Sequence, residues 1–260
     1  MRFIPAILCL FVFISCEKTE PEPITVVTVD QDFELVPSQE VDENGSKYLL
    51  VVRSLEPDSC SNATLDASYT IDGQKITIVI NGNQTDGPCE SGEIFTEKTF
   101  TLPSDLGVYD IEFIKGELVS TTGTLNINEG DFNLSVDNLG GIFLETTTIK
   151  KVPDYLVWGY AADRETVTST QIFLEEMETE LAFGIPVYED LEIGNYGLFT
   201  VNVSGEIELD DVKLDHTTFA FKIDDELVWE KLIVRLPNFS TNLPRLKYTF
   251  YRWDGIVIEN

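Results

Sequence analysis

Apolar and polar residues alternate along most of the chain after Ile24, and this two-residue period predicts β-strands. The run YLLVVRSL at 48–55 is instead mostly apolar, which is typical of a strand buried on both faces. Further strands are expected at 64–71, 76–80, 99–102, 109–113, 125–127, 132–136, 142–148, 155–160, 196–203, 217–223 and 227–236. The pattern therefore predicts a mainly β fold.

The clearest local structure is a hairpin that turns at Asp72-Gly73. This dipeptide favours a two-residue type I′ turn, because both of its positions accept a positive φ. The expected cross-strand pairs are Tyr69 with Ile76, Ala67 with Ile78, and Leu65 with Ile80. All three pairs fall on one face, so the alternation and the turn chemistry predict the same register.

One helix is predicted over residues 168–183. Thr168 and Gln171 fit a capping box, in which each side chain satisfies a backbone N–H at the start of a helix. An apolar stripe with helical spacing follows, made of Phe173, Met177 and Leu181. Gly184 and Pro186 are typical of a helix end, so the segment is bounded on both sides.

The segment Asp105-Leu106-Gly107-Val108-Tyr109 resembles the tyrosine corner of immunoglobulin-like domains. The resemblance implies an immunoglobulin-like β-sandwich over residues 24–128. Ile111 stands where that family has its second core cysteine, and no tryptophan precedes Trp158. The disulfide-and-tryptophan core of antibody domains is therefore not expected.

Glu129-Gly130 and the turn at 138–141 mark the passage into a second region. Residues 129–260 are expected to form a larger β-rich domain that contains the one helix. The chain length also favours two domains. The expected fold is thus an N-terminal sandwich followed by a mainly β domain with one α-helix.

The first fifteen residues have the parts of a secretory signal peptide. Arg2 supplies a positive charge, residues 3–14 are apolar except for Pro5, and Ser15 is a small residue at the cleavage point. About 12 apolar residues are too few to cross a bilayer, which requires about 20 in a helix. The segment therefore predicts export of the chain.

The end of this signal, Phe13-Ile14-Ser15-Cys16, resembles the lipobox of bacterial lipoproteins. The resemblance implies cleavage before Cys16 and attachment of a lipid to its thiol. Residues 17–23 (EKTEPEP) suit a stiff spacer between the lipid and the folded part. Residues 16–20 also look like the signal for surface display in lipoproteins of Bacteroidota, which implies the outer membrane; the periplasmic leaflet is the alternative.

Cys9 leaves with the signal peptide and Cys16 carries lipid, so Cys60 and Cys89 remain as one pair. Export permits a disulfide between them. Closing a loop of about 30 residues is worth on the order of 3–4 kcal/mol in chain-entropy estimates. A metal or redox role would require further ligands or a closer spacing, so we interpret the pair as structural.

The formal net charge is −29, from 46 acidic and 17 basic residues. Such a surface repels phosphate backbones, which argues against nucleic acid as a partner. It also argues against docking on anionic lipid, so the acyl chain would be the membrane anchor. The acidity favours a well-solvated exterior over a dedicated cation site.

Catalytic motifs are scarce. His216 is the only histidine, which excludes zinc sites built from several histidines, and a surface position is expected for it. The chain contains no G-x-S-x-G motif, P-loop or dinucleotide fingerprint. A pair of glycosidase carboxylates cannot be singled out among so many acids. No catalytic residue, cofactor site or metal site is predicted.

The tryptophans offer a binding hypothesis. Trp158 and Tyr160 lie before a polar turn and could stack on sugar rings as an exposed aromatic pair. The alternative is that these aromatic residues belong to a core. A last hairpin is expected at Asp254-Gly255, with Trp253 opposite Ile256 and Tyr251 opposite Ile258. That pairing makes one apolar face, which favours burial of Trp253.

These features together predict a lipid-anchored protein of the cell envelope that binds a glycan or a protein without catalysis, with the first domain as a spacer. Two other classes stay open, a carboxylate-dependent hydrolase of exported polysaccharide and a structural subunit of an envelope complex. An exposed aromatic shelf would favour a binding protein. Converging, half-buried acidic residues would favour an enzyme, and a broad apolar patch would favour a structural subunit.

Overall fold

The computed structural model describes residues 32–260, apart from 117–118, 138–139, 164–166, 181–190, 210–211 and 213–214. The predicted signal peptide, Cys16 and the spacer therefore lie outside the described residues. The described chain is mainly β, as the alternation predicts, and it contains two helices. No helix within these ranges is both long and apolar enough to span a bilayer.

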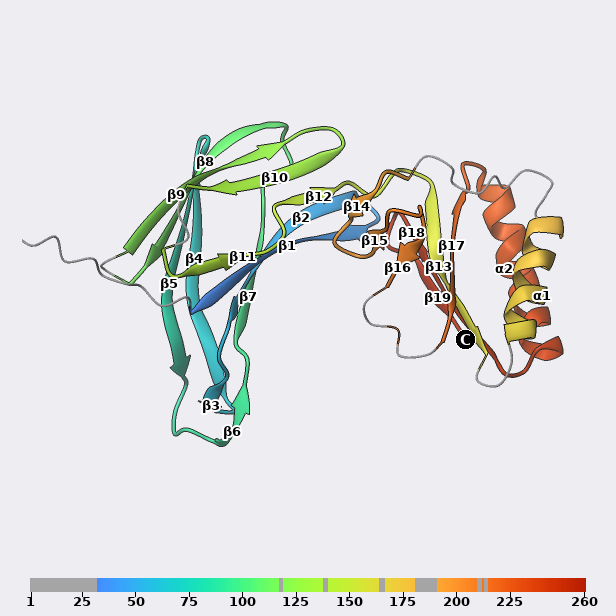
Figure 1. The fold of residues 1–260 in the computed structure, drawn as a ribbon, viewed down its shortest axis with the longest axis horizontal. Helices are drawn as coiled ribbons and strands as arrows, with labels where there is room; N and C mark the ends of the chain where they lie inside the picture. Colours follow the sequence, from blue (N-terminus) through green and yellow to red (C-terminus); the bar gives the residue numbers. More distant parts are fainter. Residues whose placement is uncertain are drawn as a thin grey trace, which may run out of the picture.

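The first body (residues 33–150) consists of two main sheets (Figure 1). The four-stranded sheet has the order β11-β1-β2-β7, with bounds Ile142–Leu144, Phe33–Asp42, Gly45–Ser54 and Glu97–Thr101. The six-stranded sheet has the order β12-β10-β9-β8-β5-β4, with bounds Thr148–Lys150, Asp131–Val136, Val119–Ile127, Gly107–Lys115, Lys75–Thr85 and Ala63–Asp72.

The inward faces of these two sheets form one hydrophobic core. Alternate residues along each strand point inward, so the sequence pattern directly supplies the core. From the four-stranded sheet the core takes Phe33, Leu35, Tyr48, Leu50, Val52, Phe100 and Ile142. From the six-stranded sheet it takes Leu65, Ile76, Ile78, Ile80, Tyr109, Ile111, Phe113, Leu125, Ile127, Phe132, Leu134 and Ile149.

Tyr109 makes the hydrogen bond that the tyrosine-corner resemblance implies, because its hydroxyl donates to the carbonyl oxygen of Asp105 at 3.1 Å. The strand pairing nevertheless differs from that of immunoglobulin domains. Strand β5 runs parallel to β8, and β1 runs parallel to β11. Immunoglobulin sheets are antiparallel, so the likeness covers the layers and the tyrosine but not the topology.

Strands β10, β11 and β12 correct the expected boundary at residue 128. We placed residues 129–150 in the second region, but β10 pairs with β9, β12 pairs with β10, and β11 pairs with β1. Phe132, Leu134 and Ile149 bury their side chains in the first core. The first body therefore extends to Lys150, and the second body is the smaller one.

The hairpin of β4 and β5 forms as expected, but its register is shifted. The turn residues are Gly73 and Gln74 rather than Asp72 and Gly73, since Asp72 pairs with Lys75. The apolar pairs are Ile71 with Ile76, Tyr69 with Ile78, and Ala67 with Ile80. A shift of two positions keeps the side chains between Ala67 and Ile80 on their faces, so alternation could not detect it. Beyond a bulge at Asp66, Leu65 pairs with Asn83 and not with Ile80.

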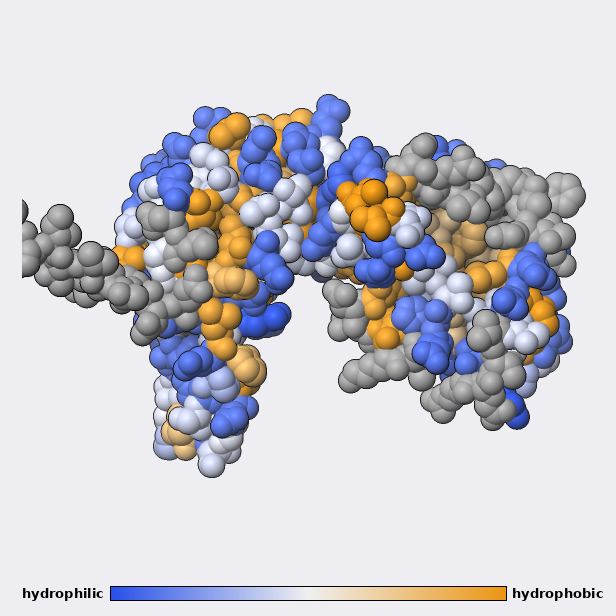
Figure 2. Space-filling model, in the orientation of Figure 1, coloured by the Kyte–Doolittle hydropathy of each residue, from blue (hydrophilic) through white to orange (hydrophobic). Residues whose placement is uncertain are grey.

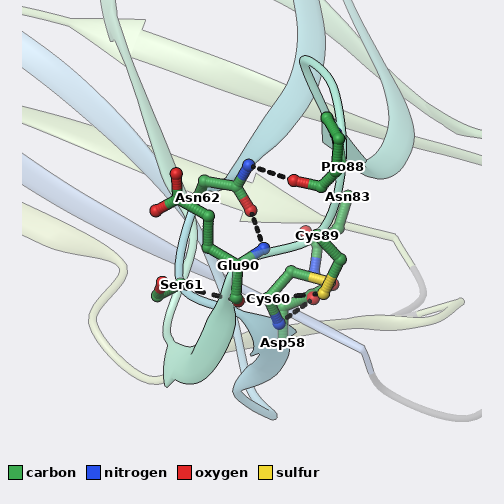
Figure 3. Close-up of a disulfide and its surroundings, with 8 residues drawn as sticks. All are labelled: Asp58, Cys60, Ser61, Asn62, Asn83, Pro88, Cys89 and Glu90. Carbon is green, nitrogen blue, oxygen red and sulfur yellow. Dashed lines mark hydrogen bonds between the residues drawn. A yellow bond between two sulfur atoms is a disulfide. The ribbon is translucent and has the colours of Figure 1, made fainter.

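Cys60 and Cys89 form the predicted disulfide, with their Cα atoms 5.1 Å apart (Figure 3). The bond lies in a finger that projects from the first body (Figure 1). This finger comprises residues 58–62 and 83–94, including β3 (Asp58–Cys60) and β6 (Ser91–Ile94). Asn62 binds across it, donating from Nδ2 to Pro88 O at 3.1 Å and accepting from Glu90 N at 3.0 Å. The finger is thus fixed by covalent and polar links.

The second body (residues 156–260) is built on a four-stranded antiparallel sheet with the order β17-β13-β18-β19. These strands are Thr217–Lys222, Leu156–Asp163, Leu246–Arg252 and Val257–Glu259. Helices α1 (Val167–Glu180) and α2 (Glu226–Asn242) cover one face of the sheet, on the side away from the first body (Figure 1). A small sheet of β14 (Gly194–Asn195), β15 (Thr200–Val201) and β16 (Ile207–Glu208) lies against the other face.

Helix α1 is the helix that the sequence predicts, beginning one residue before Thr168. Phe173 and Met177 from the predicted stripe are buried against the sheet. The ring of Phe173 stacks on that of Tyr248 with centroids 5.5 Å apart. Leu181, the third residue of the stripe, lies outside the described residues.

Helix α2 corrects a prediction, because residues 227–236 were expected to be a strand. Asp225 caps the helix by accepting a hydrogen bond from Leu227 N at 2.9 Å. The buried side chains recur at helical spacing, on Trp229, Leu232, Leu236 and Phe239. Packing of this apolar face on the sheet outweighs the strand propensity of the segment.

The last hairpin is also shifted, by one position. Tyr251 pairs with Val257 rather than with Ile258, and Arg252 N donates to Ile256 O at 2.9 Å. The connection therefore has three residues (253–255), not two. A one-residue shift moves side chains to the opposite face, and Trp253 is consequently half-buried instead of fully buried.

Candidate functional site between the two bodies

The β1–β2 hairpin reaches from the first body to the small sheet of the second (Figure 1). Gln39 of β1 lies at this junction with 2% of its surface exposed. Its Nε2 donates to the carbonyl oxygens of Lys150, at 2.7 Å, and of Tyr196, while its Oε1 accepts from Val152 N at 3.3 Å. One side chain thus links β1, the connecting segment and the small sheet.

Two glycines bring the backbones of the bodies close together. A Cβ on Gly197, whose φ is +73°, would lie 2.8 Å from Gln39 N. A Cβ on Gly255, whose φ is +84°, would lie 2.5 Å from Val41 O. Because real Cβ atoms do not approach so closely, only glycine fits at either position. The junction is therefore a close-packed contact and not a flexible link.

Trp158 does not form the exposed aromatic site of the binding hypothesis. Only 1% of its surface is exposed, because its ring stacks on Tyr251 at 5.7 Å and tilts against Phe199 at 5.2 Å. Tyr160 is half-buried and meets His216 edge-on at 5.7 Å. The alternative, a core position, holds for Trp158 because it belongs to a central strand whose second face is covered by the small sheet.

A pocket of about 670 Å³ opens beside this aromatic stack. Trp158, Phe199 and Tyr251 contribute to its wall, and so do residues of both bodies. The first body supplies Gln39, Glu40, Val41 and Leu49, and the second supplies Asn195, Leu198, Leu209, Arg252 and Val257 among others. The volume and the mostly apolar lining, with a few polar groups, are those of ligand-binding pockets.

Arg252 lines this pocket, but its guanidinium lies on the helix-covered face of the sheet, where its charge is already compensated. Its Nη1 and Nη2 donate to the two carboxylate oxygens of Glu226 at 3.0 and 2.9 Å, and Nη2 lies 2.9 Å from Asp254. Its guanidinium also lies over the ring of Trp229. Glu40, in contrast, is exposed and makes no ion pair with the described residues. Of the two charged residues that line the pocket, Glu40 is therefore the one without an ion pair among the described residues.

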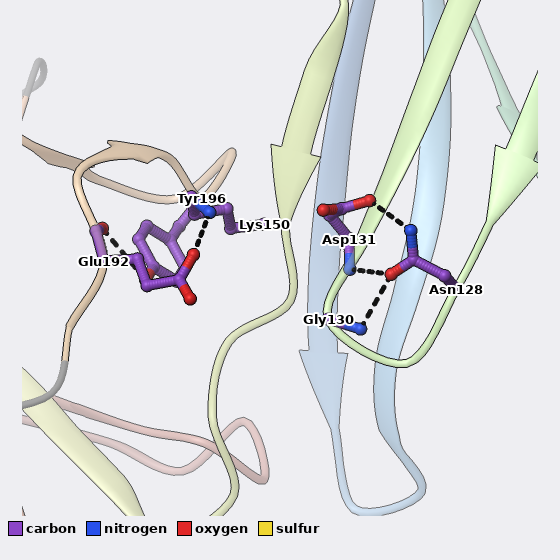
Figure 4. A network of polar contacts seen from close by, with 6 residues as sticks. All are labelled: Asn128, Gly130, Asp131, Lys150, Glu192 and Tyr196. Carbon is purple, nitrogen blue, oxygen red and sulfur yellow. Dashed lines mark hydrogen bonds and ion pairs between the residues drawn. The ribbon is translucent and has the colours of Figure 1, made fainter.

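A second, polar pocket of about 380 Å³ lies at the same junction. Figure 4 shows its side chains: Lys150 pairs with Glu192, and the Tyr196 hydroxyl donates to Glu192 O at 3.2 Å. The hydrogen bond from Lys150 holds the pKa of Glu192 below its usual range. Opposite them, Asp131 N donates to Asn128 Oδ1 at 3.0 Å. The charges of Lys150 and Glu192 are thus paired with each other.

Carboxylates suited to general acid catalysis would have raised pKa values. Among the described residues, three carboxylates have clearly shifted pKa values, and all three pKa values are lowered. Hydrogen bonds are the main cause, from Lys47 to Asp42, from Lys75 to Glu112, and from Lys150 to Glu192. These three groups are therefore held in the charged form.

A third pocket, of about 550 Å³, contains His216 together with Glu206 and Glu208. Both glutamates are exposed, and Asn202 Nδ2 donates to them at 3.4 and 2.8 Å. Within the described ranges, no three His, Cys, Asp or Glu side chains converge on a possible metal position.

The junction residue Gln39 was missed in the sequence, although a signal for it exists. Phe33, Leu35, Pro37 and Gln39 share the inward face of β1, so a polar side chain continues an apolar series. A buried amide requires hydrogen-bond partners, and these are backbone groups far along the chain.

Comparison with protein-family models, curated proteins and solved structures found no match to this chain.

Proposed function

We propose that this chain is a lipid-anchored protein of the cell envelope that holds a ligand in the junction pocket without transforming it. The observation that carries the proposal is the pocket itself, with walls from both bodies around a buried aromatic stack. A close-packed junction keeps such a pocket preformed, which lowers the entropic cost of binding.

The first body has two roles in this proposal. It spaces the pocket from the membrane, as expected from the sequence, and it also supplies part of the pocket wall through Glu40, Val41 and Leu49. The anchor rests on the resemblance of residues 13–16 to a lipobox. Mass spectrometry of the native protein tests it: a diacylglyceryl group on Cys16 supports the anchor, and an unmodified Cys16 or a retained leader contradicts it.

A binding role also fits the surface. In Figure 2 the exterior is mostly hydrophilic, with apolar residues gathered on the first body beside the finger and near the junction. The acid pair of a polysaccharide hydrolase receives less support, because the carboxylates with resolved pKa shifts are those held ionised by lysines. We therefore keep binding as the proposed class.

Leu198 offers a direct test, because it lines the pocket with 37% of its surface exposed. Leu198→Trp should fill the pocket and abolish binding on glycan and peptide arrays. Val203→Trp is the matched control, since Val203 is 86% exposed and does not line this pocket. A ligand that binds the wild-type and both variants equally would show that the binding site lies elsewhere. No detectable binding of the wild-type on either array would contradict the binding role.

A further inference from the structure

We propose that the ligand is an extended peptide segment, which adds as a strand to the free edge of β19 and places an apolar side chain in the junction pocket. This inference rests on the proposed function and specifies its ligand. Strand β19 is the last strand of its sheet within the described residues. A free sheet edge with an adjacent side-chain pocket is a common site of peptide binding.

The hydrogen bonds of β19 show which backbone groups are free. Arg252 N donates to Ile256 O at 2.9 Å, and Asn260 N donates to Tyr248 O at 3.3 Å. Bonded and non-bonded pairs alternate in an antiparallel ladder. Val257 and Glu259, which pair with Tyr251 and Thr249, are therefore non-bonded positions, and their N–H and C=O groups point away from β18.

A row of side chains leads across the sheet to this edge. Ala220 pairs with Trp158, Trp158 with Tyr251, and Tyr251 with Val257. The first three pack into the core under the small sheet, whereas Val257 is 53% exposed and lines the pocket. Residues directly opposite one another share a face, so an added strand would extend the row and place its next side chain in the pocket.

The negative charge of Glu259, next to Val257, favours a basic residue in the bound peptide. Glu259 lies two residues after Val257, on the same face of the strand. It is exposed and, like Glu40, forms no ion pair with the described residues. A complementary strand therefore carries an apolar residue opposite Val257 and Lys or Arg two positions away, opposite Glu259.

Stacking on a sugar is less suited to this pocket. Sugar-binding sites need the open face of an aromatic ring, and the rings of Trp158 and Phe199 are buried against each other and against neighbouring rings. The exposed part of the lining is aliphatic at Leu198 and Val257. This surface favours an aliphatic side chain of a peptide.

The test uses the full chain and a short synthetic peptide of alternating valine and lysine, titrated calorimetrically. A second peptide with the same side chains carries N-methyl groups on alternate residues, which removes its backbone donors without changing its charge. In the protein, Val257→Pro removes the outward N–H, a substitution that sheet edges accept. Val257→Thr retains this N–H and serves as the matched control, and circular dichroism checks that each variant is folded.

We expect saturable binding to the wild-type and to Val257→Thr. Binding should weaken about tenfold with Val257→Pro or with the methylated peptide, as expected for the loss of one or two backbone hydrogen bonds. Equal affinity for both peptides, or for Val257→Pro and wild-type, would show attraction by charge alone and overturn the proposal.

A wild-type chain that does not bind the alternating peptide would also overturn the strand-addition proposal. In that case the array experiment distinguishes a failure of the strand-addition proposal from a failure of the proposed binding function. If Leu198→Trp removes binding to a glycan while the alternating peptide does not bind, the junction pocket remains the site and its ligand is not a peptide strand. If neither array nor peptide gives binding, the proposed function and its ligand class both fall.

Discussion

The amide of Gln39 donates a hydrogen bond to the carbonyl oxygen of Lys150 at 2.7 Å, across 111 positions of the chain. The same side chain satisfies Tyr196 O and Val152 N. A buried amide with all three partners in place specifies one arrangement of the two bodies, because any other arrangement leaves polar groups unpaired. The pocket depends on that arrangement.

Replacement of Gln39 should therefore destabilise the whole chain. Gln39→Ala leaves three backbone groups, Lys150 O, Val152 N and Tyr196 O, without this partner. We expect a loss of about 2–4 kcal/mol in the free energy of unfolding. Denaturant titration measures this loss. The neighbouring Ser38→Ala, with a half-buried side chain, should change stability by no more than about 0.5 kcal/mol. Equal effects of the two variants would contradict the linking role of Gln39.

Gln39→Glu adds a pH dependence to the same position. An ionised carboxylate cannot donate to Lys150 O or Tyr196 O and is repelled by both, so its pKa should rise in the folded state. Stability should then be low at neutral pH and should increase as the pH falls and the carboxyl binds a proton. Unfolding curves across acidic pH test this, and a variant whose loss relative to wild-type is independent of pH would contradict it.

Close packing at the junction is tested by two glycines with similar backbone angles. Gly197 has φ +73° with Gln39 N 2.8 Å from its added Cβ, whereas Gly205 has φ +80° and nothing within 4 Å. Both alanine variants strain a left-handed residue, at a cost of about 1–2 kcal/mol. Gly197→Ala should lower the free energy of unfolding by about 1–3 kcal/mol more than Gly205→Ala, because of overpacking. Equal thermal stability of the two variants would contradict a close junction.

Two core tyrosines predict the response to alkaline pH. Burial raises the pKa of Tyr48 to about 12, assisted by the charge of Asp131, and burial likewise raises the pKa of Tyr69 to about 12. The unfolded chain releases these protons near pH 10, so the folded state holds more protons between pH 10 and 12. Stability is therefore fully retained below about pH 10 and is lost as the pH rises toward 12.

Tyr48→Phe and Tyr69→Phe should each reduce this alkaline loss. Neither hydroxyl has a hydrogen-bond partner among the described residues, so the variants should cost little at neutral pH. Tyr155→Phe is the control, since Tyr155 is exposed. The measurement is the free energy of unfolding as a function of pH. If the wild-type and Tyr48→Phe curves fall in parallel above pH 10, burial of Tyr48 is not the cause of the alkaline loss of stability.

The disulfide should stabilise the chain mainly by restricting its unfolded state. Cys60 and Cys89 are separated by 29 positions, and closure of such a loop is worth about 3–4 kcal/mol. The double variant Cys60→Ala, Cys89→Ala should lose about that much in denaturant titration. A reduced wild-type chain should match it, and an unchanged midpoint in both would show that the disulfide contributes nothing to stability.

Alternation predicts strands well in this chain because most strands have one buried face. The inward residues of β8 and β9 were read directly from the sequence, and so was the stripe of α1 at Phe173 and Met177. The register of strand pairing was harder to predict from the sequence. A shift of two positions in the β4–β5 hairpin keeps the same faces, so the alternation of apolar residues is compatible with either register.

The misread elements depend on contacts between distant segments. Val228, Ile233 and Val234 favour a strand by propensity and Pro237 suggests a break, yet the segment is α2 because its other face packs on the sheet. Trp158 is buried because a small sheet formed forty residues later covers it. The pocket combines residues from both ends of the chain, so no local pattern contains it.

Equilibrium binding by the two tryptophan variants tests the junction pocket most directly. A ligand selected on the arrays is titrated into the wild-type chain, Leu198→Trp and Val203→Trp under the same conditions. We predict that Leu198→Trp loses at least about tenfold in affinity, or about 1.4 kcal/mol, while Val203→Trp binds like the wild-type. Equal affinity of all three folded proteins would contradict binding in the junction pocket.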